Sequence, residues 1–327
     1  MDRKATILKI PTLLISALLL QPAFAETPFP SKPIRLITLT TPGGALDTLA
    51  RTIAQGLTER MGQPVLVEAR TGAGGNIGAD AIAKSSPDGY TIGMVTVSTH
   101  GINPTLYGAK MPFDAIKDFA PITLASVQRN IVVVHPSLPV KNIRELVAYA
   151  RANPGKVSFG SAGTGTSQHL SGELLKMVAG IDMVHVPYKG AAQAMPDLIS
   201  GQISLMFVTP HEALAQVRAG KLRALGVTSL DRSPLLPDAA PIAEQGYPGF
   251  DVRAWFGVVG PAGTPREIVN RYNRDISATL AVPATRDRLA AIGMDTATST
   301  PEQFARYIAA EIAKWAPVVK ASHAQLE

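Results

Sequence analysis

The sequence of 327 residues contains no cysteine. Without cysteine the chain has no disulfide, no thiolate nucleophile, no Cys-ligated zinc and no lipid-modified N-terminal cysteine. A small secreted scaffold would need disulfides, but a chain of this length can bury enough apolar surface without them. The absence is therefore compatible with export, and it predicts a freely soluble mature protein.

Long apolar runs are also missing. The apolar segment 13–20 is only about half of the roughly 20 residues needed to span a hydrocarbon core. Charged residues at positions 2 to 4 precede it and the small-residue pattern Ala-Phe-Ala follows it, which is the order of a secretory signal peptide. We expect residues 1–25 to be a signal peptide, cleaved after Ala25, and the mature protein to be periplasmic. The alternative is a retained amphipathic or anchoring segment.

Charge of one sign is scarce as well. The formal net charge is +6, from 31 Lys and Arg against 25 Asp and Glu. Loss of residues 1–25 takes away three basic side chains and one acidic side chain, which leaves +4. With no dense Lys/Arg run, we expect no nucleic-acid partner, and the modest positive excess is compatible with capture of anions.

Hydrophobic periodicity predicts strands that alternate with helices, and hence an α/β fold with parallel sheets. Strands are predicted at 34–38, 65–68, 91–97, 131–134, 157–159, 183–186, 203–207, 223–228 and 252–259. Helices are predicted at 45–61, 78–84, 143–150, 167–179, 191–199, 212–219, 265–280, 284–291 and 301–319. The alternation comes in two runs, so two α/β units are expected. A Pro/Gly-rich segment at 229–249 separates the second run from the last predicted strand and the helices that follow it.

The turns that follow the predicted strands are polar and rich in glycine. The longest are segments 40–44, 71–78 and 160–170. Ligands of open α/β sheets bind beyond the carboxyl ends of the strands, where glycine lets the backbone approach a ligand and helix N-termini offer free N–H groups. These turns predict an anion site, although each turn alone is also compatible with an ordinary helix cap.

Rival chemistries fit the sequence less well. Gly72, Gly74 and Gly78 miss the dinucleotide-binding spacing, no phosphate-binding Gly-x-x-x-x-Gly-Lys run exists, and the six histidines form no His-Glu-x-x-His pair. A serine hydrolase built on Ser161 or Ser167 with His169 would lack the Gly-x-Ser-x-Gly elbow. We therefore expect no enzyme activity, no cofactor and no metal, with the hydrolase kept as an alternative.

At these glycine-rich segments the chain resembles the Bug-type receptors, the substrate-binding proteins of tripartite tricarboxylate transporters. The resemblance runs through KPIRLI, TPGGALD, GAGGNIGA, PDGYT, NPTLY, DFAPI, PGKVSFGSAGTGTSQHL, HVPYKG, AGKLRALGVT and PAGTP, in this order. It implies a two-lobed periplasmic-binding-protein fold of the Venus flytrap type II, with the ligand cleft between the lobes. Lobe one would comprise residues 26–127 and 229–327, and lobe two residues 128–228.

The resemblance also implies a ligand site made of backbone amides and hydroxyls from both lobes. On lobe one it maps to Thr40, Pro42, Gly43, Gly44, Ala73, Gly74, Gly75 and Asn76. On lobe two it maps to Ser161, Gly163, Thr164, Gly165, Thr166 and Ser167. The alternative is a side-chain clamp dominated by one arginine, such as Arg70 or Arg129.

The implied partners are a small carboxylate and the integral membrane subunits of the transporter, and we expect a monomer. Many relatives carry an acid where this chain has Val208, and an acid there would suit a ligand with an ammonium group. A simple mono- or dicarboxylate is therefore expected rather than an amino acid. A ligand sensor for a membrane signalling protein uses the same fold and is kept as an alternative function.

Overall fold

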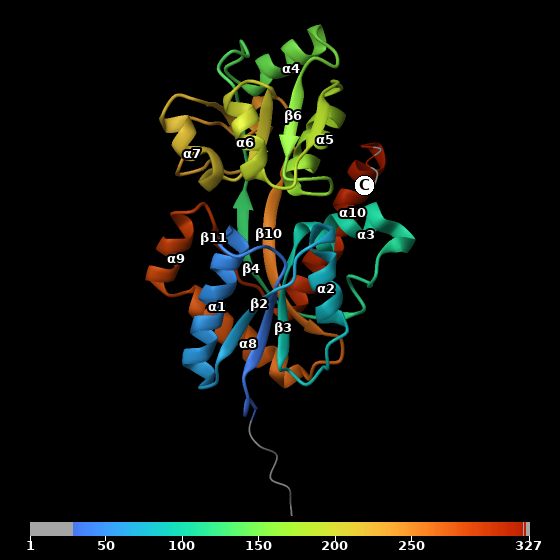
Figure 1. Cartoon of the computed structure of the whole chain (residues 1–327), viewed down its shortest axis with the longest axis vertical. Coiled ribbons are helices and arrows are strands. Elements are labelled where there is room, and N and C mark those ends of the chain that lie inside the picture. The colour runs from blue at the N-terminus through green and yellow to red at the C-terminus, as the bar shows by residue number, and fades with distance from the viewer. Residues whose placement is uncertain (1–28, 323, 325–327) are drawn as a thin grey trace, which may run out of the picture.

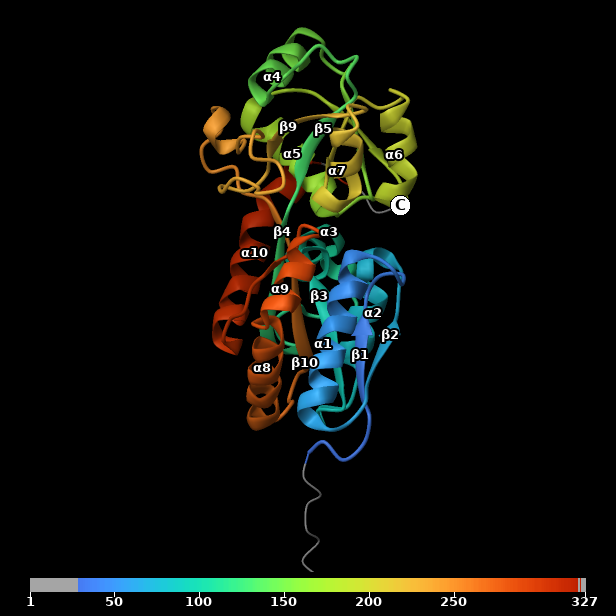
Figure 2. The same ribbon diagram turned by 90° about the vertical axis from the view of Figure 1, so that its left-hand side faces the viewer.

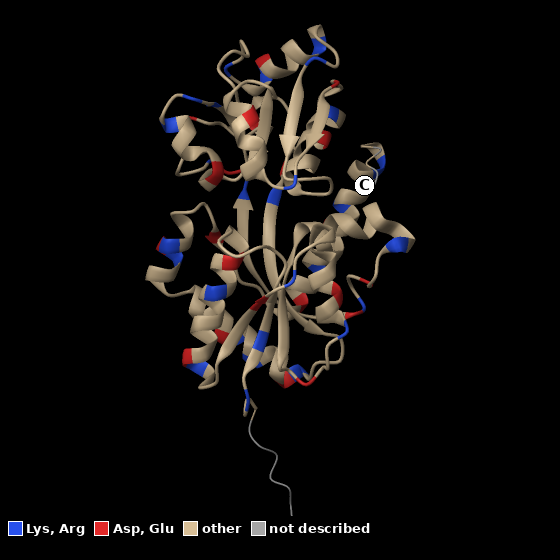
Figure 3. Ribbon diagram, viewed as in Figure 1, with Lys and Arg blue, Asp and Glu red and all other residues tan. Residues whose placement is uncertain are grey.

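The computed structural model describes residues 29–322 and 324, so the predicted signal peptide lies outside the described part. The chain forms two α/β lobes stacked along the long axis of the molecule, each built on one β-sheet (Figure 1). The view turned by 90° shows the same two layers joined by long strands that run between them (Figure 2). Acidic and basic residues are interspersed over both lobes (Figure 3).

Lobe one is built on a six-stranded sheet in the order β11-β4-β10-β3-β1-β2. Its strands are β1 (Ile34–Thr38), β2 (Val65–Ala69), β3 (Thr91–Thr96), β4 (Phe119–Arg129), β10 (Arg253–Pro261) and β11 (Asp295–Thr296). Its helices are α1 (Ala45–Met61), α2 (Asn76–Ala83), α3 (Asn103–Tyr107), α8 (Arg266–Leu280), α9 (Pro283–Ala290) and α10 (Pro301–Ala321). Short turns of 3-10 helix, η1 (Ala73–Gly75) and η3 (Gly108–Lys110), and of π-helix, η2 (Ser98–Ile102), adjoin α2 and α3.

Lobe two is built on a five-stranded sheet in the order β7-β6-β8-β5-β9. Its strands are β5 (Ile131–Val134), β6 (Ser158–Ser161), β7 (Val184–Pro187), β8 (Leu205–Val208) and β9 (Arg223–Val227). Its helices are α4 (Ile143–Ala152), α5 (Ser167–Ala179), α6 (Ala191–Ile199) and α7 (Pro210–Arg218). A short 3-10 helix, η4 (Ala243–Gln245), lies in the irregular segment that follows β9.

The two sheets share one topology. In each, three parallel strands are ordered second, first, third, and the strand that arrives from the other lobe then pairs antiparallel with the third. That arriving strand is β10 in lobe one and β5 in lobe two, and each also pairs antiparallel with a fourth strand. The arrangement confirms the predicted two-lobed α/β fold of the periplasmic-binding type.

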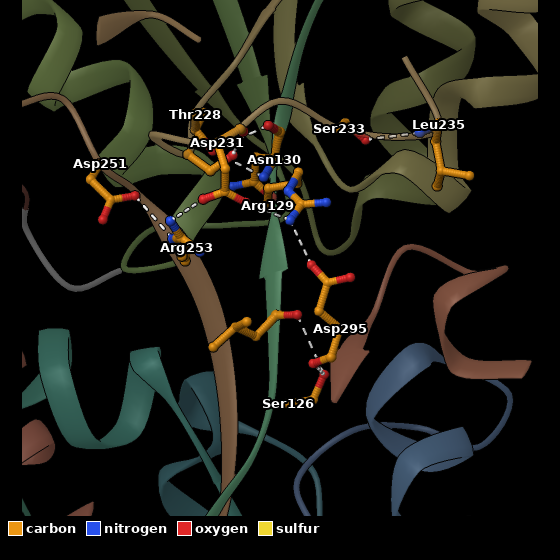
Figure 4. Close-up of polar contacts among 12 residues, drawn as sticks. Ser126, Arg129, Asn130, Thr228, Asp231, Ser233, Leu235, Asp251, Arg253 and Asp295 are labelled. Atoms are coloured by element: carbon orange, nitrogen blue, oxygen red, sulfur yellow. Dashed lines mark hydrogen bonds and ion pairs between the residues drawn. The ribbon is translucent and has the colours of Figure 1, made fainter. Parts of the chain in front are cut away.

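The two crossings between the lobes lie side by side. Thr228 joins them, because it bonds to the main chain of Asn130 after β4 and its hydroxyl donates to the Val252 carbonyl before β10 at 2.6 Å. Charged side chains gather at the same place (Figure 4): Arg129 bonds Asp295 at 2.6 Å and Asp231 at 2.9 Å. Short, ordered crossings of this kind form a hinge about which two rigid lobes can close.

The lobe boundaries remain a proposal. We place the first crossing at Asn130 rather than at residue 127, because β4 pairs with β10 as far as Arg129. We place the second crossing at Val252, where the irregular segment that follows β9 leads into β10.

Most predicted elements are present within one to three residues of their predicted ends, but β4 was not predicted. Its sequence, FAPITLASVQR, carries a proline and several hydroxyl and amide side chains, which weaken the strand pattern. The strand forms because it lies between β10 and β11 and buries Ile122 and Ala125 in the core. Tertiary pairing here decides the structure over local preference.

Within the described residues, no helix combines the length and the apolar character needed to cross a bilayer.

Candidate functional site

A cleft of 1410 Å³ separates the two lobes. From lobe one it is lined by Gly72, Ala73, Gly74, Tyr107 and Lys110. From lobe two it is lined by Gly163, Thr164, Pro187, Tyr188, Lys189 and Gln193. The volume exceeds the roughly 300–1,000 Å³ of typical small-molecule pockets, so a small ligand would be enclosed only after the lobes close.

The lobe-one side of the cleft is an unusual turn between β2 and α2. Ala73, Gly74 and Gly75 have positive φ angles of 47°, 63° and 95° in succession, a conformation that glycine adopts without steric cost. Gly75 donates its N–H to the Gly72 carbonyl at 2.9 Å, whereas the N–H groups of Ala73 and Gly74 have no acceptor among the described residues. Both residues line the cleft, so this wall of the cleft contains two amides that are free to donate.

The lobe-two turn, between β6 and α5, satisfies most of its own N–H groups. Its internal bonds run from Ala162 N to Gln168 Oε1 (2.8 Å), Gly163 N to Ser161 Oγ (3.1 Å), Gly165 N to His169 Nδ1 (3.2 Å) and Thr166 N to Gly163 O (3.3 Å). Within the turn as described, Thr164 keeps an N–H without an acceptor, and Thr164 lines the cleft. The free donor on this side is therefore a single amide in a fixed frame.

Two lysines give the cleft its charge. Lys110 follows α3 and Lys189 follows β7, both are exposed, and neither forms an ion pair with the described residues. Among the described residues that line the cleft, none is acidic. The Tyr188 hydroxyl donates to Asp197 at 2.7 Å. Burial is the main cause that raises the pKa of Tyr188 to about 12, and the hydrogen bond to Asp197 adds to it. The cleft is therefore positive, and the Tyr188 ring is held in place.

The two lobes touch beside the cleft. Gly165 faces α3, where a Cβ on it would lie 2.8 Å from Leu106 Cδ2 and 3.2 Å from Asn103 Oδ1. The amide nitrogen of Asn103 donates to Asn76 Oδ1 at 2.8 Å. Asn103 thus lies between the predicted loops of the two lobes, and the missing side chain at Gly165 allows this approach.

The structure brings together four of the predicted site residues: Ala73, Gly74, Gly163 and Thr164 all line the cleft. Gly75, Asn76, Ser161, Gly165 and Ser167 are buried next to it, and Thr166 is half-buried. The hydroxyl of Thr166 donates to Gly163 O at 2.7 Å and accepts the His169 N–H at 3.3 Å, so it caps α5. Ligand contact by these residues stays a prediction.

The loop that precedes α1 is not among the residues that line the cleft, although Thr40, Pro42, Gly43 and Gly44 are exposed or half-buried. Ligand contact by these four residues stays a prediction. The N–H of Gly43 donates to Asp47 Oδ2 at 3.0 Å. The pKa of Asp47 lies below its usual range, mainly because Arg51 donates a hydrogen bond to the carboxylate and to a smaller extent because Gly43 does. Gly43 therefore already has an acceptor inside the protein.

The arginines of the alternative clamp have partners elsewhere. Arg129 is bound to Asp231 and Asp295 at the crossing (Figure 4), and Arg70 pairs with Glu68 at 2.7 Å. Neither of them lines the cleft.

A serine and a histidine do meet in lobe two, but not as the hydrolase alternative requires. Ser161 Oγ lies 2.7 Å from His185 Nε2, whereas His169 bonds to the Gly165 N–H instead. Ser161 is 0% exposed and its hydroxyl also bonds to the main chain of Gly163, so it is not presented to the cleft. Within the described residues, no group of three or more acidic or histidine side chains is placed to hold a metal ion.

Three buried histidines predict a loss of stability in mild acid. Burial lowers the pKa of His100 to about 3, of His169 to about 3 and of His185 to about 4. A histidine in the unfolded chain titrates near pH 6.5, so acid protonates the unfolded chain before the folded protein. The free energy of unfolding therefore has its highest value above pH 6.5 and falls as the pH is lowered toward 4.

The expected loss at pH 5 is on the order of 2 kcal/mol for each of these histidines. Urea unfolding at pH 7, 6 and 5 measures it. His100→Leu should flatten the slope, and replacement of the exposed His211 should leave it unchanged; equal stability at pH 7 and pH 5 would contradict the assignment.

Several lining residues were not predicted from the sequence. They lie at the ends of α3, η3 and β7, directly after β7, and in the first turn of α6, and only the folded arrangement brings them to one cleft: Tyr107, Lys110, Pro187, Tyr188 and Gln193. The motifs NPTLY and HVPYKG contain Tyr107 and Tyr188 and were the available signal.

Comparisons with known proteins identify the family and agree with this fold. Residues 49–323 match the family described as tripartite tricarboxylate transporter family receptor. BugT of Bordetella pertussis is 36% identical over 310 residues, which cover 94% of each chain.

Two solved structures share the fold. The R. palustris protein Rpa4515 with adipate has a TM-score of 0.82 and 36% identity, covering 91% of this chain and 100% of that one. MatC from Rhodopseudomonas palustris with bound malate has a TM-score of 0.78 and 31% identity, covering 89% and 100%. Together with the family match, these relatives confirm the predicted resemblance: this chain belongs to the receptor family of the tripartite tricarboxylate transporters, whose members are periplasmic solute-binding proteins.

Proposed function

We propose that this protein captures a small mono- or dicarboxylate in the periplasm, between its two lobes, and delivers it unchanged to the integral membrane subunits of a tripartite tricarboxylate-type transporter. The observation that carries the proposal is the cleft, whose described lining residues include free amides of both lobes and two unpaired lysines and no acidic side chain. Backbone N–H groups and lysines are suited to bind carboxylates. The proposal includes cleavage after Ala25 and a monomeric mature protein.

The ligands of two relatives support the proposed ligand class. Rpa4515 was solved with adipate and MatC with malate, and each is a dicarboxylate. In this chain the amides of Ala73, Gly74 and Thr164 would hold one carboxylate. Lys110 and Lys189 would attract a second one.

A thermal-shift panel of the mature protein tests the proposal. Succinate, malate, adipate, benzoate and the neutral diamide of adipate should be compared, because a ligand that binds only the folded state raises the melting temperature. At least one carboxylate should raise it, and the diamide should not. Mass spectrometry of the recovered ligand should show no conversion. Repeated conversion of the ligand would favour the hydrolase. Uptake of the bound carboxylate should be compared in cells with and without the transporter genes, and equal uptake in both would favour the sensor.

The lysines make a prediction about dicarboxylates. Lys110→Gln and Lys189→Gln should each weaken binding of a dicarboxylate by about 1.5-fold to fivefold, the range expected for one solvent-exposed charge pair. Binding of the matching monocarboxylate should change less. Titration calorimetry at low and high salt measures both effects, because salt screens exposed charges. Lys141→Gln, an exposed lysine outside the cleft, is the control; equal loss for mono- and dicarboxylates would contradict the assignment.

A further inference from the structure

Two stacked histidines lie behind the lobe-two turn. His169 is in the first turn of α5 and His185 is on β7, and their ring centroids are 4.0 Å apart with 26° between the ring planes. Phe159 of β6 stacks on His185 at 4.9 Å. His169 is 3% exposed, and neither histidine lines the cleft.

Each ring holds one end of the turn. His169 Nδ1 accepts the N–H of Gly165 at 3.2 Å, and His185 Nε2 lies 2.7 Å from Ser161 Oγ. The same serine oxygen accepts the N–H of Gly163 at 3.1 Å. Gly163 and Gly165 flank Thr164, so the two rings fix the residues on both sides of the free amide.

The contact with Gly165 requires a neutral ring. A protonated imidazole has two N–H donors and no acceptor, so His169 must carry its proton on Nε2 for Nδ1 to accept. Burial, more than any neighbouring charge, lowers the pKa of His169 and of His185, and the pair is therefore uncharged at pH 7. The charged groups that act on the pair are Glu173, with Oε1 4.0 Å from His169 Nε2, and Lys176.

We propose that His169 and His185 are positioning residues for ligand binding, which act through Gly165 and Ser161 to hold the Thr164 N–H toward the cleft. The inference rests on the proposed carboxylate-binding function. It assigns to the two rings a role that packing alone does not require, because any apolar side chain of similar size would fill the same space. What only the histidines supply is the acceptor for Gly165 and the partner for Ser161.

Substitutions that separate the packing role of each histidine from its role as a hydrogen-bond partner test the proposal. His169→Asn keeps an oxygen near the position of Nδ1, and His169→Leu fills part of the space without an acceptor. We expect His169→Leu to weaken adipate binding at least tenfold and His169→Asn to stay within threefold of the wild type. His185→Gln, which keeps a polar atom near Nε2, and His185→Leu form a second pair with the same expected order. His211→Leu is the control, since this exposed histidine lies on α7.

Hydrogen exchange gives a readout that needs no ligand. The Gly165 amide should exchange at least tenfold faster in His169→Leu than in the wild type, with His169→Asn close to the wild type, because loss of the acceptor opens the turn locally. Wild-type adipate affinity in His169→Leu, or equal losses in the Asn and Leu variants, would overturn the proposal. If the wild type bound neither a monocarboxylate nor a dicarboxylate, the proposed function would fail, and the exchange result would still decide whether the rings hold the turn. If His169→Leu did not fold, the His185 pair would decide.

Discussion

Gly163→Val is expected to abolish carboxylate binding, with a loss of at least a hundredfold in affinity, in a protein that still folds. Gly163 lines the cleft with a φ of +125°, a conformation that β-branched residues rarely adopt. A Cβ there would lie 3.3 Å from the Tyr188 carbonyl, and the Tyr188 side chain is tied to Asp197. The added side chain must therefore displace the turn that carries the Thr164 amide.

Gly180→Val is the matched control for this prediction. Gly180 follows the last turn of α5 and also has a positive φ, +58°, so valine is strained there as well, but a Cβ would meet nothing within 4 Å and the residue does not line the cleft. Both variants should lose a similar free energy of unfolding, on the order of 1–2 kcal/mol. Titration calorimetry should show affinity within threefold of the wild type for Gly180→Val alone. Equal affinities in the two variants would refute a cleft formed by the lobe-two turn.

Glu311→Leu is expected to cause the largest loss of stability, about 3–5 kcal/mol, because it leaves two buried indole N–H groups without an acceptor. Glu311 Oε2 accepts from Trp255 Nε1 of β10 at 2.9 Å and from Trp315 Nε1 of α10 at 3.0 Å. Both tryptophans are 0% exposed. Urea unfolding measures the loss as a shift in midpoint with an unchanged slope.

The same variant should also weaken ligand binding. Helix α10 packs on η2 and α3, and a Cβ on Gly101 of η2 would lie 3.3 Å from the Trp315 ring. Since α3 carries Tyr107 into the cleft, loosening α10 moves part of the cleft wall. Glu311→Gln keeps one acceptor oxygen and should lose less than half as much stability. A loss as large for Gln as for Leu would show that the charge, rather than the acceptor, holds the two rings.

The sequence predicted the fold better than the site, for physical reasons. The period of apolar residues identifies helices such as α5, whose ends agree with the prediction, because burial of one face acts locally along the chain. Strand β4 was not predicted because its stability comes from pairing with β10 and β11, which are more than 100 residues away in the sequence. Pairing partners at that distance leave no local signal.

The site was predicted in part. The glycine turns at 72–75 and 161–167 could be identified because positive φ angles demand glycine at several of their positions. The sequence did not predict which amides of the glycine-rich turns remain free. The N–H of Gly165 donates to His169 and the N–H of Gly43 donates to Asp47, and these partners are set by the folded structure. Lys110 and Lys189 reach one cleft only through the packing of the two lobes.

The central claim is that one carboxylate is held by backbone amides of both lobes. Titration of the ¹⁵N-labelled mature protein with the best ligand of the thermal-shift panel, followed by amide NMR, tests it most directly. The resonances of Gly74 and Thr164 should move together, at the same ligand concentration, toward the positions typical of amides bonded to a carboxylate. Shifts confined to one lobe, or a saturating ligand that leaves both amides unmoved, would contradict the account.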